Sequence, residues 1–142
     1  MNIWVNGCFD VLHIGHLNLL QSAKYYRDPT HSKKGDKNRL IVGIDSDKRV
    51  KQLKGIGRPI NGEKDRQRML EALKIVDKVV IFNSIEELRN NIKIWDIDFM
   101  MVGDQYKDKE VIGSENSKYG VLFYPVDEHS TTDIIKKIKE RC

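Results

Sequence analysis

The stretch Val5–His16 reads V-N-G-C-F-D-V-L-H-I-G-H and holds two histidines, His13 and His16, one helical turn apart. Residues three positions apart lie on the same face of a helix, so both imidazoles can face one ligand. Gly15 lies between them, and because it has no side chain a ligand can come close to the backbone. This combination predicts an anion site, with a phosphate as its expected occupant.

The residues on either side of this stretch support the same interpretation. The apolar run Ile3–Val5 ends at Asn6-Gly7, which predicts a buried strand that stops at a turn. A mixed amphipathic pattern from Leu17 onward predicts a helix that begins near Gly15 or His16. The backbone N–H groups and the positive dipole end of that helix would then point at the ligand of the two histidines.

Zinc is a second possible ligand for paired histidines at helical spacing. The chain has no H-E-x-x-H sequence and no cysteine cluster, since its cysteines are Cys8 and Cys142. We therefore favour phosphate over zinc at His13 and His16. The two separated cysteines also predict no disulfide framework.

The segment Gly7–His16, G-C-F-D-V-L-H-I-G-H, resembles the signature of the cytidylyltransferase-like nucleotidyltransferases. Its H-I-G-H element is also similar to one in class I aminoacyl-tRNA synthetases, but those enzymes are much longer and carry a K-M-S-K-S-type signature that this chain lacks. Further segments match the nucleotidyltransferases in family order: Gly43–Asp47, Leu53–Gly55, Arg58–Asn61, Arg66 with Arg68, Val76-Asp77, Val102–Tyr106, Ile112–Ser114 and Ser130–Ile135. The resemblance therefore covers nearly the whole chain.

Within this family, the chain looks most similar to the adenylyltransferase domain of the bacterial ADP-heptose synthases. The similarity rests on L-K-G-x-x-R-P at Leu53–Pro59 and S-T-T-x-I-I-K-K-I at Ser130–Ile138. Glycerol-3-phosphate cytidylyltransferases are the alternative, but they carry an arginine where this chain has Pro125. The resemblance thus implies ATP or CTP as donor and a small phosphorylated acceptor, foremost a sugar 1-phosphate for nucleotide-sugar and cell-surface polysaccharide synthesis.

Apolar segments alternate with helical patterns along the chain, which predicts a parallel sheet with crossover helices. The expected strands are 3–6, 40–44, 78–82, 99–102 and 121–124, and the expected helices are 16–26, 47–53, 62–75, 85–91 and 131–140. We expect an α/β fold: a single Rossmann-like nucleotidyltransferase domain over residues 1–142, with a five-stranded parallel sheet and helices on both faces. The polar segment Asp28–Asn38 is expected to be a flexible surface loop whose His31, Lys33 and Lys34 could reach an acceptor.

Charge and hydropathy restrict the classes of function. Of the 142 residues, 25 are Lys or Arg and 21 are Asp or Glu, which gives a net charge of +4 and a pI near 9.0. The basic residues are dispersed and form no stripe with aromatic residues, which argues against nucleic acid as a partner. No apolar run approaches membrane-spanning length and no signal-peptide pattern precedes the first strand, so we expect no membrane contact and a cytoplasmic location.

In nucleotidyl transfer, an acceptor phosphate attacks the α-phosphorus of a nucleoside triphosphate and pyrophosphate leaves, so positioning and charge neutralisation provide the catalysis. The resemblance implies four catalytic residues: His13, His16, Lys54 and Arg66. It implies these nucleotide-binding residues: Gly7, Cys8, Phe9, Asp10, Gly15, Lys51, Gly103, Asp104, Tyr106, Ser130, Thr131 and Thr132. Asp10 is also a candidate ligand of the Mg²⁺ that accompanies the triphosphate.

Two other classes of function stay open at this point. A nucleotide-binding regulatory module without turnover is one, although the intact His13, His16, Lys54 and Arg66 argue against it. A nucleic-acid-binding domain is the other, and the dispersed charge argues against it. The resemblance also implies a homodimer, in which Trp95 could serve the interface, although a core position is the stronger expectation for this side chain.

Overall fold

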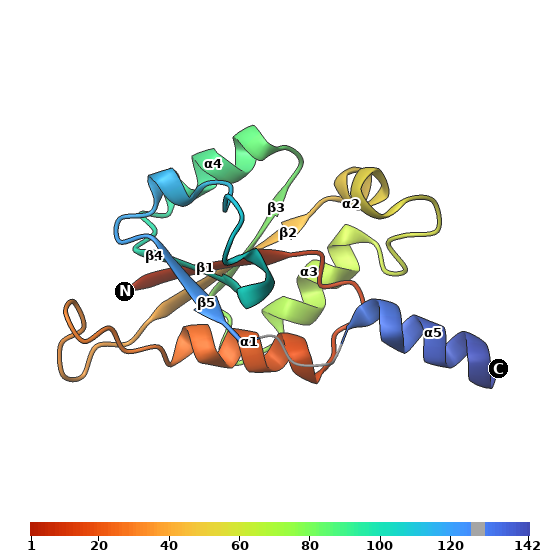
Figure 1. Cartoon of the computed structure of the whole chain (residues 1–142), viewed down its shortest axis with the longest axis horizontal. Helices are drawn as coiled ribbons and strands as arrows, with labels where there is room; N and C mark the ends of the chain where they lie inside the picture. The colour runs from red at the N-terminus through yellow and green to blue at the C-terminus, as the bar shows by residue number, and fades with distance from the viewer. Residues whose placement is uncertain (126–129) are drawn as a thin grey trace.

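The computed structural model describes residues 1–125 and 130–142 and shows one five-stranded sheet with helices around it (Figure 1). The strands are β1 (Asn2–Gly7), β2 (Arg39–Asp45), β3 (Lys78–Phe82), β4 (Phe99–Gly103) and β5 (Val121–Tyr124). All neighbouring strands run parallel, in the order β3-β2-β1-β4-β5. The expected Rossmann-like α/β fold and its strands are therefore confirmed.

The helices are α1 (Ile14–Lys24), α2 (Asp47–Lys54), α3 (Glu63–Glu71), α4 (Ile85–Ile94) and α5 (Thr131–Arg141). Two short 3-10 helices, η1 (Asp104–Tyr106) and η2 (Ser114–Asn116), lie between β4 and β5. The helix expected to reach Ile75 ends earlier, because N–H groups of Leu73 and Val76 bond carbonyls three residues back and turn the chain toward β3. Among the described residues, no helix has the length and apolar character needed to cross a bilayer.

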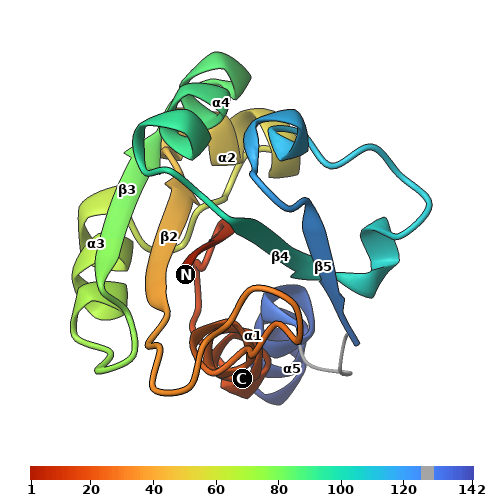
Figure 2. The same ribbon diagram turned by 90° about the vertical axis from the view of Figure 1, so that its left-hand side faces the viewer.

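Each face of the sheet has its own hydrophobic core, because successive side chains of a strand point to opposite faces. Ile3 and Val5 of β1 pack in one core with side chains from α1 and α3. Trp4 lies in the other core with Leu88 and Ile92 of α4. Figure 2 shows α1 and α4 on opposite sides of the sheet, which confirms the expectation of helices on both faces.

Gly43 in β2 is required by its neighbour Trp4 in β1. A Cβ atom at position 43 would lie 2.1 Å from the Trp4 ring. The ring is fully buried, and its Nε1 donates a hydrogen bond to Asn6 Oδ1 at 3.0 Å. The glycine thus leaves room in β2 for the ring of Trp4, the largest fully buried side chain of the core.

The position of β1 determines where a ligand can bind. Its neighbours are β2 and β4, so the strand order reverses at β1, and the loops that follow β1 and its neighbours diverge there. Open parallel sheets bind ligands in the crevice that such a reversal leaves at the carboxyl ends of the strands. The stretch with the two histidines directly follows β1 and therefore lies at this crevice.

The segment Asp28–Asn38 lies at the opposite, amino end of the sheet, between α1 and the start of β2. It is closed by its own hydrogen bonds, such as those from the Arg27 guanidinium to the carbonyls of Lys33 and Asp36. The His31 ring stacks on Tyr119, just before β5, with ring centroids 3.7 Å apart. The expectation that His31 reaches an acceptor is therefore wrong, because its ring is packed at the other end of the sheet.

Candidate functional site

A cleft of about 540 Å³ opens at the carboxyl ends of the strands. This volume is typical of small-molecule sites. Both α1 and α5 begin at its wall, and helix N-termini attract anions through their N–H groups and dipole. The residues of the sequence-based site that line the cleft are Gly7, Cys8, Phe9, His13, Gly15, His16, Lys54, Gly103, Tyr106, Ser130, Thr131 and Thr132.

His13 and His16 together cap the N-terminus of α1. Nδ1 of His13 accepts a hydrogen bond from the Gly15 N–H at 3.1 Å, and the His13 N–H donates to Nδ1 of His16 at 3.2 Å. The two rings stack with centroids 3.8 Å apart. Because each Nδ1 is an acceptor, a neutral ring carries its proton on Nε2. The helix cap therefore fixes both the orientation and the tautomer of the two rings.

Phe9 makes the tight turn between β1 and the histidines. Its backbone is left-handed, with φ 51°, a conformation that residues other than glycine seldom adopt. The ring is buried and lies against His16, with centroids 5.0 Å apart. A Cβ at Gly7 would lie 3.2 Å from this ring, so the glycine leaves it room. Backbone strain of this kind persists where the surrounding structure holds it, and functional sites are common places for it.

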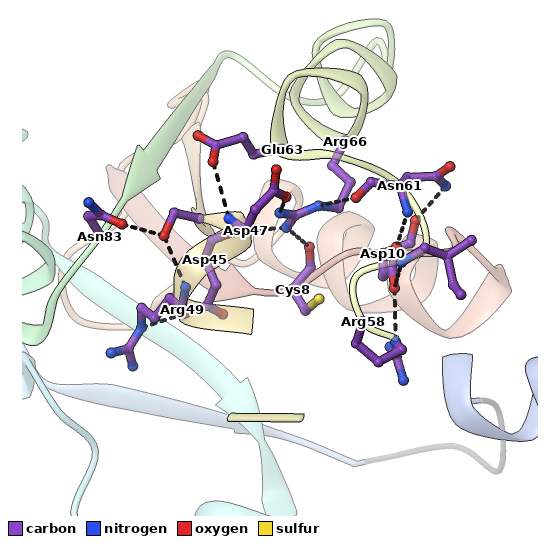
Figure 3. A network of polar contacts seen from close by, with 12 residues as sticks. Cys8, Asp10, Asp45, Asp47, Arg49, Arg58, Asn61, Glu63, Arg66 and Asn83 are labelled. Atoms are coloured by element: carbon purple, nitrogen blue, oxygen red, sulfur yellow. Dashed lines mark hydrogen bonds and ion pairs between the residues drawn. The ribbon is translucent and has the colours of Figure 1, made fainter. Parts of the chain in front are cut away.

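Asp10 lies beneath the cleft rather than in it. Its side chain is 0% exposed, and its carboxylate accepts hydrogen bonds from the N–H groups of Ile60 and Asn61 at 2.8 Å and from Arg58 Nε at 3.0 Å. Burial raises the pKa of Asp10, but the hydrogen bonds and the Arg58 charge lower it by a larger amount. The pKa of Asp10 therefore lies below its usual value. The charged carboxylate thus anchors the segment between α2 and α3 to the loop after β1 (Figure 3).

This arrangement does not support Asp10 as a magnesium ligand, because its side chain is fully buried and does not line the cleft, and its carboxylate faces donors of the protein itself. Within residues 1–125 and 130–142, no three His, Cys, Asp or Glu side chains gather in a way that could hold a metal ion.

Arg66 is also buried, with 1% of its surface exposed. Its guanidinium donates to the carbonyls of Cys8 and Asp45 at 2.8 Å and of Asn61 at 2.9 Å, and to the Asp47 carboxylate at 2.8 Å (Figure 3). The structure therefore does not support the expected contact between Arg66 and phosphates. The arginine instead joins the ends of β1 and β2 to the segments around α3.

Lys54 and Lys51 differ in position although both are exposed residues of α2. Lys54, the last residue of the helix, lines the cleft, whereas Lys51 does not. Gly55 caps the end of this helix with a positive φ of 88°. Asp104 is not among the lining residues either, although Gly103 before it is.

The cleft also contains residues that the sequence reasoning did not place there. Asp45 and Arg49 line it and form an ion pair at 2.7 Å, and Arg58, Gln105 and Glu110 line it as well. Two signals could have found some of them. Asp45 is the last residue of β2, at the ligand-binding edge, and Arg58 lies in the R-P-I-N segment that contributed to the resemblance.

The strand order, and the cleft at the point where that order reverses, define a Rossmann-like protein with two helix N-termini at the wall of its cleft. The chain belongs to the cytidylyltransferase-like family, a family of nucleotidyltransferases, whose model matches residues 4–137. The resemblance seen in the sequence is thereby confirmed.

Curated relatives cover nearly all of this chain. It is 47% identical to the bifunctional protein HldE of Campylobacter fetus subsp. fetus over 137 residues. The match covers 96% of this chain and 28% of that protein. It is also 43% identical over 140 residues to the bifunctional protein HldE of Helicobacter pylori strain 26695, and this match covers 99% of this chain and 28% of that protein. The chain thus spans little more than a quarter of the length of these relatives.

A solved structure shows the same fold. The crystal structure of the lipopolysaccharide core biosynthesis protein from Thermoplasma volcanium GSS1 matches with a TM-score of 0.66 and 19% identity, over 92% of this chain and 98% of that one. At this identity the likeness supports the fold alone.

Proposed function

We propose that this chain transfers a nucleoside monophosphate from a nucleoside triphosphate to a small phosphorylated acceptor and releases pyrophosphate. The observation that carries the proposal is the stacked pair His13 and His16, held at the N-terminus of α1 in the cleft. Family membership supports the same reaction.

The proposed reaction requires stabilisation of charge rather than a covalent intermediate. A phosphate oxygen of the acceptor bonds to the α-phosphorus, the bond from this phosphorus to the bridging oxygen of the β-phosphate breaks, and pyrophosphate leaves with that electron pair. Negative charge develops on the oxygens of the five-coordinate α-phosphorus. The Nε2–H groups of His13 and His16 are suited to stabilise it, and the Lys54 ammonium is suited to neutralise the triphosphate.

Magnesium enters the proposal as a companion of the nucleoside triphosphate, whose charge it would partly neutralise. The described side chains do not fit a protein-held ion, because the Asp10 carboxylate is buried outside the cleft and faces donors of the protein itself. We therefore assign no residue of this chain as a metal ligand.

For the substrates, we propose ATP and a heptose 1-phosphate or a closely similar sugar 1-phosphate. The segments Leu53–Pro59 and Ser130–Ile138 resemble the ADP-heptose synthases, and the curated relatives are HldE proteins, which share that adenylyltransferase domain. These relatives do not favour the alternative of CTP and glycerol 3-phosphate, and Pro125 argues against it as well.

The composition of the cleft supports a polyhydroxylated acceptor. Asp45 and Glu110 line the cleft together with the cations. Carboxylates accept hydrogen bonds from hydroxyl groups. A sugar carries several hydroxyl groups, whereas a phosphate group offers mainly acceptor oxygens. The acidic residues therefore suit the sugar part of the acceptor, and the basic residues suit the phosphates.

We further propose a homodimer that acts in the cytoplasm without nucleic-acid or membrane partners. Trp95 is not a candidate for its interface, since the ring packs against the core that contains Trp4. The Arg39 guanidinium and the Lys78 ammonium lie over the Trp95 ring, 5.1 and 5.8 Å from its centroid. Ile138 of α5, 55% exposed, is a better candidate.

Pyrophosphate release in the presence of Mg²⁺ tests the reaction and the substrates together. ATP and CTP are each combined with heptose 1-phosphate, other sugar 1-phosphates and glycerol 3-phosphate. Release with ATP and a sugar 1-phosphate is expected. Release only with CTP and glycerol 3-phosphate would contradict the proposed substrates, and nucleotide binding without any release would favour a regulatory module.

A further inference from the structure

Arg58 lies in the cleft with only part of its guanidinium in use. Its Nε donates to Asp10 Oδ2 at 3.0 Å, and its side chain is 14% exposed. Within the part of the chain that the structure describes, Arg58 Nη2 is buried and has no hydrogen-bond partner. A buried charged donor without an acceptor is unfavourable and rare in folded proteins, so the guanidinium keeps donor capacity that no described group of the protein uses.

The guanidinium is held in position from behind. Asp10, its partner, is itself fixed by the N–H groups of Ile60 and Asn61, and the Asn61 side-chain amide donates to the Asp10 carbonyl at 3.0 Å. Arg58 and both of these donors belong to the same short segment between α2 and α3 (Figure 3). Several hydrogen bonds therefore hold this segment against Asp10, and they orient Arg58 before any ligand binds.

The surroundings of Arg58 favour an anion as the acceptor for this donor capacity. His13 and Thr131 line the same cleft, one at the N-terminus of α1 and the other in the first turn of α5. Thr131 Oγ1 donates to the Val11 carbonyl at 3.2 Å, which ties the start of α5 to the loop after β1. A planar guanidinium binds phosphate through two parallel hydrogen bonds, a geometry that lysine cannot supply.

We propose that Arg58 is a phosphate-binding residue: its Nη atoms bind a phosphate group of the substrates while its Nε stays on Asp10. This inference rests on the proposed nucleotidyl transfer for the identity of the ligand. The phosphate belongs either to the triphosphate or to the acceptor, and both offer the same oxygen acceptors. Asp10, expected from the sequence to be a metal ligand, acts in this proposal as the residue that positions Arg58.

The test compares Arg58→Gln and Arg58→Lys with Arg68→Gln as a matched control. Arg68 is an exposed arginine of α3 that does not line the cleft. Each variant is titrated calorimetrically with MgATP and, separately, with inorganic phosphate, and its acceptor KM and kcat are measured by pyrophosphate release. Thermal unfolding shows whether each variant is folded.

For both Arg58 variants we expect a weakening of at least tenfold in one binding step while Arg68→Gln matches the wild type. A weaker affinity for MgATP assigns the phosphate to the nucleotide, and a raised acceptor KM with unchanged MgATP affinity assigns it to the acceptor. Arg58→Lys keeps the positive charge, so its failure shows that the guanidinium geometry is needed.

The proposal is overturned if folded Arg58→Gln matches Arg68→Gln in every binding and kinetic measurement. It is also overturned if Arg58→Lys restores all of them. The binding titrations need no turnover, so an enzyme that releases no pyrophosphate but loses MgATP or phosphate affinity in Arg58→Gln would disprove only the proposed reaction. A wild type that binds neither probe would disprove both.

Discussion

The polar residues of this site form two layers that the motifs do not distinguish. Asp10 and Arg66 form the buried layer, with side chains that are 0% exposed and hydrogen bonds to the protein itself. His13, His16 and Lys54 form the cleft layer, which lines the space where a ligand fits. A residue typical of a binding motif can therefore act by shaping the site instead of touching the ligand.

The two layers should respond differently to substitution. In the buried layer, removing one partner leaves the other polar groups buried and unpaired, which costs stability. In the cleft layer, removing a donor costs mainly the stabilisation of charge during the reaction. Unfolding and turnover, measured on the same variants, can therefore separate the layers.

The largest expected effect on stability is that of Arg66→Met. The substitution leaves the carbonyls of Cys8, Asp45 and Asn61 without their common donor, so we expect a loss of about 3–5 kcal/mol in the free energy of unfolding. Urea denaturation of Arg66→Met beside Arg68→Met measures this loss. Equal stability of the two variants would remove Arg66 from the buried layer.

The next largest effect is expected on turnover in His13→Asn. Asparagine is a good N-cap residue, so α1 keeps its cap and the unfolding free energy should change by less than about 1 kcal/mol. The loss of the imidazole should lower kcat about 100- to 1,000-fold, as the loss of a preorganised donor does in other enzymes.

The matched control is His31→Asn, which changes a histidine at the amino end of the sheet and should leave kcat unchanged. A normal kcat in His13→Asn, or an equal loss in His31→Asn, would contradict the assignment of His13 to the cleft layer.

A smaller, pH-dependent effect is expected for Asp10→Asn. The pKa of Asp10 is lowered in the folded protein, so its contribution to stability is fully present above the unfolded-state value near 4 and is lost as the pH falls through the folded value. We expect Asp10→Asn to be about 1–3 kcal/mol less stable than the wild type at pH 7.

This stability difference should shrink as the pH falls below about 4, because the wild-type carboxyl then becomes neutral as well. Urea denaturation of both proteins across this pH range measures it. A difference that stays constant with pH would show that the charge of Asp10 does not stabilise the fold.

The smallest of these effects is expected for Lys54→Ala. The side chain is exposed, so stability should stay within about 0.5 kcal/mol of the wild type, as for most surface substitutions. The KM for the nucleotide should rise about tenfold, equivalent to about 1.4 kcal/mol of lost binding. Lys51→Ala is the matched control, and steady-state kinetics that show the same rise for both lysines would argue against a specific role of Lys54.

The strands and most helices could be predicted from the sequence, because each element shows its type in the spacing of apolar residues within its own short segment. The sequence also located the histidine pair, since a helix start and a spacing of three residues are local features. The end of α3 could not be predicted, because the tight turns at Leu73 and Val76 leave no clear mark in the apolar pattern.

The division into two layers could not be predicted either, because it depends on contacts between residues distant in sequence. Arg66 meets the carbonyl of Cys8, 58 residues away, and Asp10 meets the backbone of Asn61, 51 residues away. A motif shows which residues lie near a site but not which side chains turn away from it. For the same reason, the stacking of His31 on Tyr119 was not foreseen.

The most direct test of the central claim is pyrophosphate release from MgATP in the presence of heptose 1-phosphate, measured for the wild type beside His16→Ala. We expect acceptor-dependent release by the wild type and a rate at least about 100-fold lower for the variant, which should remain folded. Equal rates for the two proteins, or no release by a folded wild type that binds ATP, would contradict the central claim.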